Sequence, residues 1–108
     1  MKPYKKLPNL SGSEISILAA LASKERYGLE IIEAIKKATH GQEVLSLGGL
    51  YTTLHRMEAK GLVTSEWGDS TDVRLGARRR YYRITGLGQR ALDDSKNILM
   101  MTFRLATA

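Results

Sequence analysis

The stretch Leu45-Ser-Leu-Gly-Gly-Leu-Tyr-Thr-Thr-Leu-His-Arg-Met-Glu-Ala-Lys-Gly61 decides the fold, because it carries signals for both ends of a helix. Ser46 is a favourable N-cap, and Gly61 suits the left-handed position that follows a last helical turn. Between these ends, apolar residues recur at intervals of four and three and predict one buried face, made of Leu50, Leu54 and Met57. The opposite face is short, polar and cationic, and carries Gly49, Thr52, Thr53, Arg56 and Lys60.

Two shorter helices are expected before this one. Ser11-Gly-Ser-Glu14 has the spacing of a capping box, so a first helix begins there and runs to about Ala22. A connection over residues 23–26 leads to a second helix over about 27–39, and Gly41 stops it. The first helix is expected to bury Ile15, Leu18, Ala19 and Ala22, and the second Tyr27, Ile31, Ile35 and Ala38.

A β-hairpin and a last helix are expected after Gly61. Residues 62–67 and 79–84 are rich in β-formers and predict two strands, joined by a long loop over 69–78. Tyr81 and Tyr82 should pack on opposite sides of the hairpin, and Trp67 should lie in the core or in an interface. Thr85 can cap a helix that reaches almost to Ala108.

The predicted last helix is apolar over more than half of its circumference. One side carries Leu87, Ala91, Ile98, Met101 and Leu105, and the adjoining side carries Leu92, Leu99, Phe103 and Ala106. A helix that packs on its own domain through one face needs a narrower apolar stripe than this helix carries. A second subunit that pairs through the same helix is the simplest explanation; the alternative is that both sides bury within one chain.

Positive charge is concentrated in the second strand and the loop before it. The 108-residue chain carries a formal charge of +6, and Arg74, Arg78, Arg79, Arg80 and Arg83 fall in one span without an acid. Lys2, Lys5 and Lys6 form a smaller group at the N-terminus. Clustered basic residues favour a polyanionic partner, and a merely solubilising surface is the alternative.

Composition argues against several other classes of protein. There are no cysteines, so disulfides and thiolate metal sites are excluded. No leader-like apolar run is present near Met1, and no apolar stretch is long enough to span a bilayer, so a cytoplasmic chain without a membrane partner is expected. His55 and His40 lack clustered carboxylates, and no catalytic motif is present; we expect no metal, no cofactor and no enzymatic activity.

Five blocks of sequence closely resemble the PadR family of transcriptional regulators. They are Tyr27-Gly-Leu-Glu-Ile-Ile32, Leu45-Ser-Leu-Gly-Gly-Leu-Tyr51, Leu54-His-Arg-Met-Glu-Ala-Lys-Gly-Leu-Val63, Ser65-Glu-Trp67, and Arg80-Tyr-Tyr-Arg-Ile-Thr85 with Gly88. The single helix that follows them resembles the compact subfamily. The resemblance implies a homodimeric winged-helix repressor that binds a palindromic operator and is released by a small aromatic or drug-like ligand. The family commonly has Thr, Ser or Ala where this chain has Gly49.

These observations predict a mainly α fold with a small β-hairpin, a winged helix-turn-helix followed by a dimerisation helix. The expected parts are a basic N-terminal arm (1–10), a winged helix-turn-helix DNA-binding domain (11–85) and a C-terminal dimerisation helix (86–108). The expected function is that of a sequence-specific dimeric DNA-binding transcriptional regulator. A winged-helix module that binds protein without specific DNA binding is the alternative.

Candidate contacts to double-stranded DNA come from the capped helix and the arginine hairpin. Tyr51 resembles a family tyrosine that faces the DNA backbone, and its alternative role is to pack against the wing. Arg56 either reads a base or holds a phosphate, and Arg74 is a candidate for the minor groove. The full candidate set is Ser46, Gly48, Gly49, Tyr51, Thr52, Thr53, His55, Arg56, Arg74, Arg78, Arg79 and Arg80.

Candidate dimerisation residues all lie on the last helix. They are Leu87, Ala91, Leu92, Ile98, Leu99, Met101 and Leu105. An effector, where one exists, is expected at the dimer interface around Ile98, Leu99, Met101 and Phe103. The alternative is that these side chains simply fill the dimer core.

Overall fold

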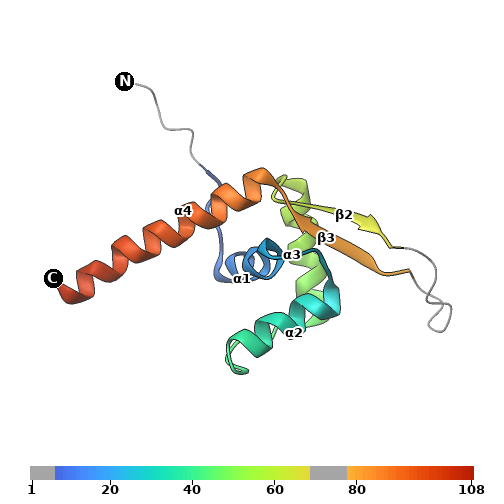
Figure 1. The fold of residues 1–108 in the computed structure, drawn as a ribbon, viewed down its shortest axis with the longest axis horizontal. Helices are drawn as coiled ribbons and strands as arrows, with labels where there is room; N and C mark the ends of the chain where they lie inside the picture. Colours follow the sequence, from blue (N-terminus) through green and yellow to red (C-terminus); the bar gives the residue numbers. More distant parts are fainter. Residues whose placement is uncertain (1–6, 69–77) are drawn as a thin grey trace, which may run out of the picture.

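A computed structural model describes residues 7–68 and 78–108, while residues 1–6 and 69–77 lie outside the description. The elements in chain order are α1 (Gly12–Ala22), β1 (Arg26–Tyr27), α2 (Gly28–Ala38), α3 (Leu47–Ala59), β2 (Val63–Trp67), β3 (Arg80–Ile84), α4 (Gly86–Phe103) and a final 3-10 turn (Arg104–Thr107). The expected fold class is confirmed: a winged helix-turn-helix with a small sheet is followed by one long helix. In Figure 1 the hairpin β2–β3 and the helix α4 leave the body in opposite directions.

Side-chain caps are present at the starts of α1, α3 and α4, at the residues that the sequence predicts. Ser11 and Glu14 make the reciprocal capping box of α1, with the Ser11 backbone N–H donating to Glu14 Oε1 over 2.8 Å. Ser46 Oγ accepts the Gly49 N–H over 3.1 Å at the start of α3, and Thr85 Oγ1 accepts the Gly88 N–H over 3.0 Å at the start of α4. At the other end of α3, Gly61 has a φ of 77°, the left-handed conformation that the sequence predicts.

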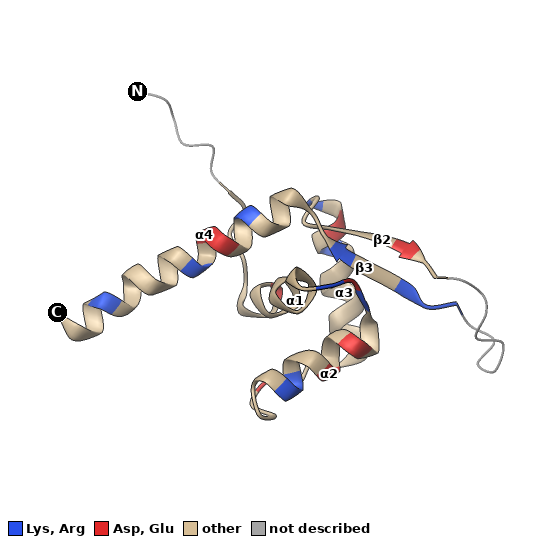
Figure 2. Ribbon diagram, viewed as in Figure 1, with Lys and Arg blue, Asp and Glu red and all other residues tan. Residues whose placement is uncertain are grey.

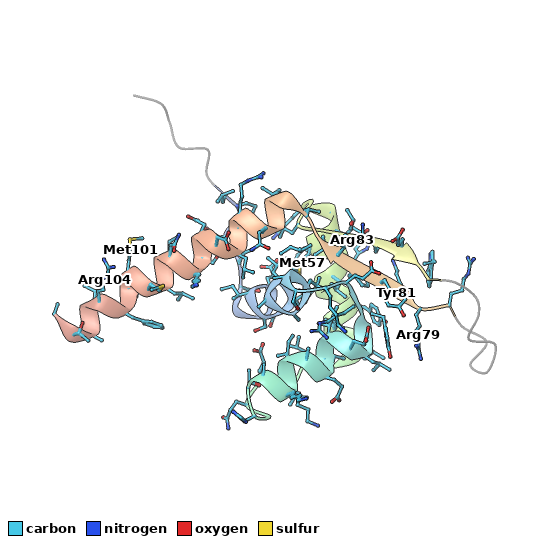
Figure 3. All side chains as sticks on the ribbon, in the orientation of Figure 1. Met57, Arg79, Tyr81, Arg83, Met101 and Arg104 are labelled. Atoms are coloured by element: carbon cyan, nitrogen blue, oxygen red, sulfur yellow. The ribbon has the colours of Figure 1, made fainter. Side chains whose placement is uncertain are left out.

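Helices α1, α2 and α3 share one core. Leu50, Leu54 and Met57 are buried on α3 as predicted, and Met57 lies at the centre of the molecule in Figure 3. The prediction for α1 was wrong in part, because its buried face consists of Glu14, Ile17, Leu18 and Leu21. Ala19 and Ala22 are exposed, and Ile15 is half-buried. The buried face begins at Glu14, one residue before the predicted start at Ile15, so the whole face is shifted by one position.

The sheet has three antiparallel strands in the order β1-β3-β2. The sequence did not predict β1: Arg26 and Tyr27, at the end of the expected connection, pair with Tyr82 and Tyr81. The two tyrosines of β3 do pack on opposite sides, since Tyr82 is buried and Tyr81 meets the Tyr27 ring edge-on at 5.6 Å between centroids. Trp67 is 56% exposed and is not part of the core.

Helix α4 has two halves with different surroundings. Ala91 is fully buried, and Leu87 and Leu92 pack on the same core, so the first half belongs to the chain's own domain. The second half extends beyond the body, as Figure 1 shows, and its apolar side chains are exposed: Ile98, Leu99, Met100, Met101, Phe103 and Leu105. None of the helices in the described ranges combines the length and apolar character that a bilayer crossing requires.

Candidate nucleic-acid interface

The outward face of α3 presents short polar and cationic side chains. Tyr51, Thr52, His55 and Arg56 are exposed, and Thr53 is half-buried. The hydroxyls of the two threonines donate to carbonyls one turn earlier, Thr52 to Gly48 over 3.0 Å and Thr53 to Gly49 over 2.9 Å. Each hydroxyl oxygen keeps its acceptor capacity. This face of α3 is therefore a polar surface that can both donate and accept hydrogen bonds.

The loop end of the hairpin presents arginines beside aromatic rings. Arg78 and Arg79 are exposed just before β3, and the Arg79 guanidinium lies 4.6 Å from the centroid of the Tyr27 ring. Figure 2 shows Lys and Arg gathered along β3 toward the loop, and Figure 3 places Arg79 and Tyr81 there. The remaining candidate of the hairpin, Arg74, lies outside the described residues.

A groove of about 630 Å³ joins these two surfaces. One wall is α3, the other is the hairpin, and the start of α2 closes one side. The sequence did not predict the part played by α2, because Tyr27 and Leu29 reach the groove only through the fold. The lining residues are Tyr27, Leu29, Leu47, Tyr51, His55, Glu58, Trp67, Arg78, Arg79, Arg80 and Tyr82. Of the candidate contacts on α3, Tyr51 and His55 therefore border the same groove as Arg78, Arg79 and Arg80, whereas Thr52, Thr53 and Arg56 do not line it.

Tyr51 reaches across the groove to the beginning of α2. A side chain at Gly28 would place its Cβ only 2.6 Å from Tyr51 Oη, so the ring lies directly over that glycine. The ring is 42% exposed in this position. The sequence left open whether Tyr51 packs against the wing or faces outward, and its contact is with α2.

Arg80 differs from the two arginines before it. Its Nε donates to Ser65 Oγ over 2.9 Å, and its Nη2 lies 3.4 Å from Glu58 Oε1 on α3. Its guanidinium also lies 5.3 Å from the centroid of the Trp67 ring. The arginines thus occupy different environments, as the alternation of side chains along a strand predicts.

Arg83 of the same basic cluster faces the other side of the sheet. Its Nη2 lies 3.0 Å from Glu25 Oε2 and 3.3 Å from Glu66 Oε1. The hydrogen bond that Arg83 donates to Glu25, with the charges of both carboxylates, raises the pKa of Arg83. These two acids neutralise Arg83 on the opposite face of the sheet.

Residues 17–94 match the sequence profile of the transcriptional regulator PadR-like family. The chain belongs to this family. As a PadR-like protein it is a transcriptional regulator with a winged helix-turn-helix, a DNA-binding fold, and not an enzyme. No cluster of three or more potential metal ligands occurs in residues 7–68 and 78–108.

Relatives of this PadR-like chain are known by sequence and by structure. The transcriptional regulator Rv3488 of Mycobacterium tuberculosis is 39% identical over 85 residues, which cover 79% of this chain and 73% of that protein. The structure of a PadR family transcription regulator from Clostridium difficile has 30% identity and a TM-score of 0.72, covering 87% of this chain and 93% of that one. Bacillus subtilis PadR, solved in complex with operator DNA, has 20% identity and a TM-score of 0.67 over 78% of this chain and 46% of that one, which shows the fold alone.

Proposed function

We propose that this PadR-like regulator is a cytoplasmic homodimeric repressor that binds a palindromic operator. The observation that carries the proposal is the groove shared by α3 and the arginine hairpin. A helix of this diameter suits the major groove, and the cleft beside it suits the adjacent phosphate backbone. Bacillus subtilis PadR, which has the same fold, was solved in complex with operator DNA, and this supports DNA as the partner.

The proposal assigns the following roles to candidate residues of α3 and of the segment before β3. The N-terminal turn of α3, with Ser46, Gly48 and Gly49, approaches the DNA backbone closely. Because the Gly49 N–H already donates to Ser46 Oγ, the earlier N–H groups of the turn are the ones presented to a phosphate. Side chains on the outward face of α3 contact base edges and nearby phosphates: the exposed Thr52, His55 and Arg56 and the half-buried Thr53. Tyr51, Arg78 and Arg79 surround the phosphates that lie in the groove. The same proposal assigns residues 1–10 to a basic arm, 11–85 to the DNA-binding domain and 86–108 to dimerisation.

The exposed half of α4 supports the homodimer. Pairing through this half would cover the apolar side chains that the chain's own core leaves outside, and it would relate two copies of α3 by a two-fold axis. A dimer of this kind reads half-sites about one helical turn apart. Because Leu87, Ala91 and Leu92 pack within the chain, the proposed contacts are those of Ile98, Leu99, Met101 and Leu105.

In the same proposal, a small aromatic or drug-like effector binds between the two copies of α4 and releases the operator. The exposed side chains around Leu99 and Phe103 offer an apolar surface for such a ligand between two copies of α4. The fluorescent aromatic sulfonate anilinonaphthalene sulfonate is a suitable probe. We expect it to bind the free dimer and to displace the operator; binding to the dimer that leaves the operator bound would contradict the release mechanism.

The test of the function is a titration of a palindromic fragment from the promoter of the protein's own gene. Arg78 and Arg79 of two subunits provide four phosphate contacts, so affinity should fall about 100-fold between about 50 and 200 mM salt. A scrambled fragment of the same length should bind more weakly at both salt concentrations. Affinity that does not depend on salt, or equal affinity for both fragments, would contradict DNA-binding regulation. A monomer that pairs only with another protein would favour the protein-interaction module.

A further inference from the structure

We propose that Arg80 is a positioning residue, which fixes the wing to the recognition helix α3 and does not itself bind phosphate. The inference rests on the proposed DNA-binding function. It assigns to Arg80 a role different from that of Arg78, although both belong to one run of arginines.

The guanidinium of Arg80 is engaged on its edge by two elements. Ser65 on β2 accepts from Arg80 Nε over 2.9 Å, and Glu58 on α3 lies 3.4 Å from Arg80 Nη2. Ser65 in turn donates its hydroxyl proton to Glu58 Oε2 over 2.7 Å. Three side chains from α3, β2 and β3 thereby form one closed triangle. Because β2 and β3 are the strands of the wing, this triangle sets the angle between wing and helix.

Aromatic rings occupy the space beside the same guanidinium. Its Cζ lies 5.3 Å from the Trp67 ring centroid and 6.0 Å from the Tyr82 ring centroid. Arg80 and Trp67 are direct partners in the β2–β3 register, so the strand pairing itself holds the contact. A phosphate that bound Arg80 in the fork geometry arginine prefers would have to displace Glu58 or Ser65. The charge of Arg80 is already offset within the chain.

Alignment of this kind matters because the two DNA-contacting elements reach different parts of the duplex. If the wing pivots relative to α3, the helix and the arginines before β3 cannot contact their sites at the same time. Glu58 is therefore useful to DNA binding although its charge repels phosphate. Simple electrostatics makes the opposite prediction, namely that removing this carboxylate strengthens binding.

The experiment compares four variants of the full chain for operator affinity and its salt dependence. Arg78→Ala should reduce the slope of log affinity against log salt by about 2, because one contact is lost in each subunit. Arg80→Ala, Arg80→Lys and Glu58→Gln should each leave the slope unchanged and lower affinity about tenfold, as the loss of two half-exposed ion pairs per dimer allows. Arg80→Lys keeps the charge but not the planar fork that reaches Ser65 and Glu58 together.

A second measurement needs no DNA and so separates this inference from the proposed function. Trp67 is the only tryptophan of the chain, and acrylamide quenching of its fluorescence reports how firmly the triangle holds the wing. Quenching should rise in Arg80→Ala and Glu58→Gln and stay at the wild-type level in Arg78→Ala. Unchanged quenching in the first two variants would overturn the inference, as would tighter operator binding by Glu58→Gln or a lower salt slope in Arg80→Ala. A wild-type protein that does not bind its operator would contradict the proposed function instead.

Discussion

Glu14 is a charged side chain in the buried core, with 3% of its surface exposed. Burial alone would raise its pKa, but the hydrogen bonds from Ser11 and the positive charges of Lys60 and Arg56 outweigh burial and lower the pKa below 4.5. Lys60 Nζ lies 3.7 Å from Glu14 Oε2. Since Lys60 is the C-cap of α3, this carboxylate both starts α1 and contacts the end of the recognition helix.

The pKa of Glu14 predicts how stability depends on pH. A carboxyl whose pKa is lowered by folding stabilises the native state above its unfolded pKa and loses this effect as pH falls through the folded value. Glu14→Gln should therefore lower the free energy of unfolding by about 1–2 kcal/mol at pH 7, as the loss of a cap and its charged hydrogen bond does. The difference should shrink below the ordinary value of 4.5.

Urea denaturation at pH 7 and at about pH 3 measures both effects. Glu33→Gln is the matched control, because Glu33 is an exposed residue of α2 and should tolerate the change at either pH. A stability loss in Glu14→Gln that is equal at the two pH values would contradict the assignment.

Replacing Gly48 by alanine should have opposite effects on stability and on DNA binding. Nothing in the chain lies within 4 Å of the Cβ that a side chain would add there, so packing within the chain does not require glycine. Gly48→Ala should raise the free energy of unfolding by up to about 1 kcal/mol, since alanine favours the helix. It should weaken operator binding if the first turn of α3 approaches DNA closely. Gly12→Ala, at a similarly open site on α1, should leave DNA binding unchanged; equal operator affinity for both variants would contradict the close approach.

At the scale of elements, the first turn of α4 is attached to the strands by a contact that only glycine permits. A Cβ at Gly88 would overlap the carbonyl oxygen of Leu62 and lie 2.9 Å from Ile84 Cγ1. The backbone carbonyl of Leu62 cannot move aside as the end of a flexible side chain can. Gly88→Ala should therefore destabilise the protein by about 3 kcal/mol. Gly86→Ala, two residues earlier and exposed, should be nearly neutral. Thermal melts of the two variants check the difference, and similar melting temperatures would contradict it.

The elements that the sequence predicts well are those set by neighbouring residues. Ser46 and Gly61 lie at the two ends of α3, and each acts through residues within one turn, so the boundaries follow from the local sequence. Strand β1 was missed because Arg26 and Tyr27 form it only by pairing with residues more than fifty positions later. The buried face of α1 was misplaced because it includes a charged residue, which an apolar pattern does not count.

The candidate site shows the same division. The cationic face of α3 and the arginines before β3 could be named from their residue types and spacing. Their common groove could not, because Tyr27 reaches it from β1 and Leu29 from α2. The different environments of Arg79 and Arg80 follow from the register of β3 against β2 and from Glu58 on another element, which the sequence pattern does not reveal.

At the scale of the whole molecule, the second half of α4 leaves its apolar side chains exposed within residues 7–68 and 78–108. Phe103 is 66% exposed and Met101 57%, and Figure 3 places Met101 well away from the body. A charge within this apolar surface should prevent pairing. Light scattering should give twice 12.0 kDa for the wild type and 12.0 kDa for Phe103→Glu. Asn97→Asp adds a charge on the polar side of α4 and should remain dimeric; a monomeric wild type would contradict the proposed dimer.

The central claim is that each subunit presents α3 and the arginine hairpin as one DNA-binding surface, and that pairing through α4 sets two such surfaces one helical turn apart. The most direct measurement is the affinity of the wild-type protein for its operator before and after five base pairs are inserted between the half-sites. The insertion rotates one half-site to the opposite side of the duplex. Affinity should fall at least about 100-fold, because the second subunit can no longer engage. Equal affinity for the two fragments would contradict the account.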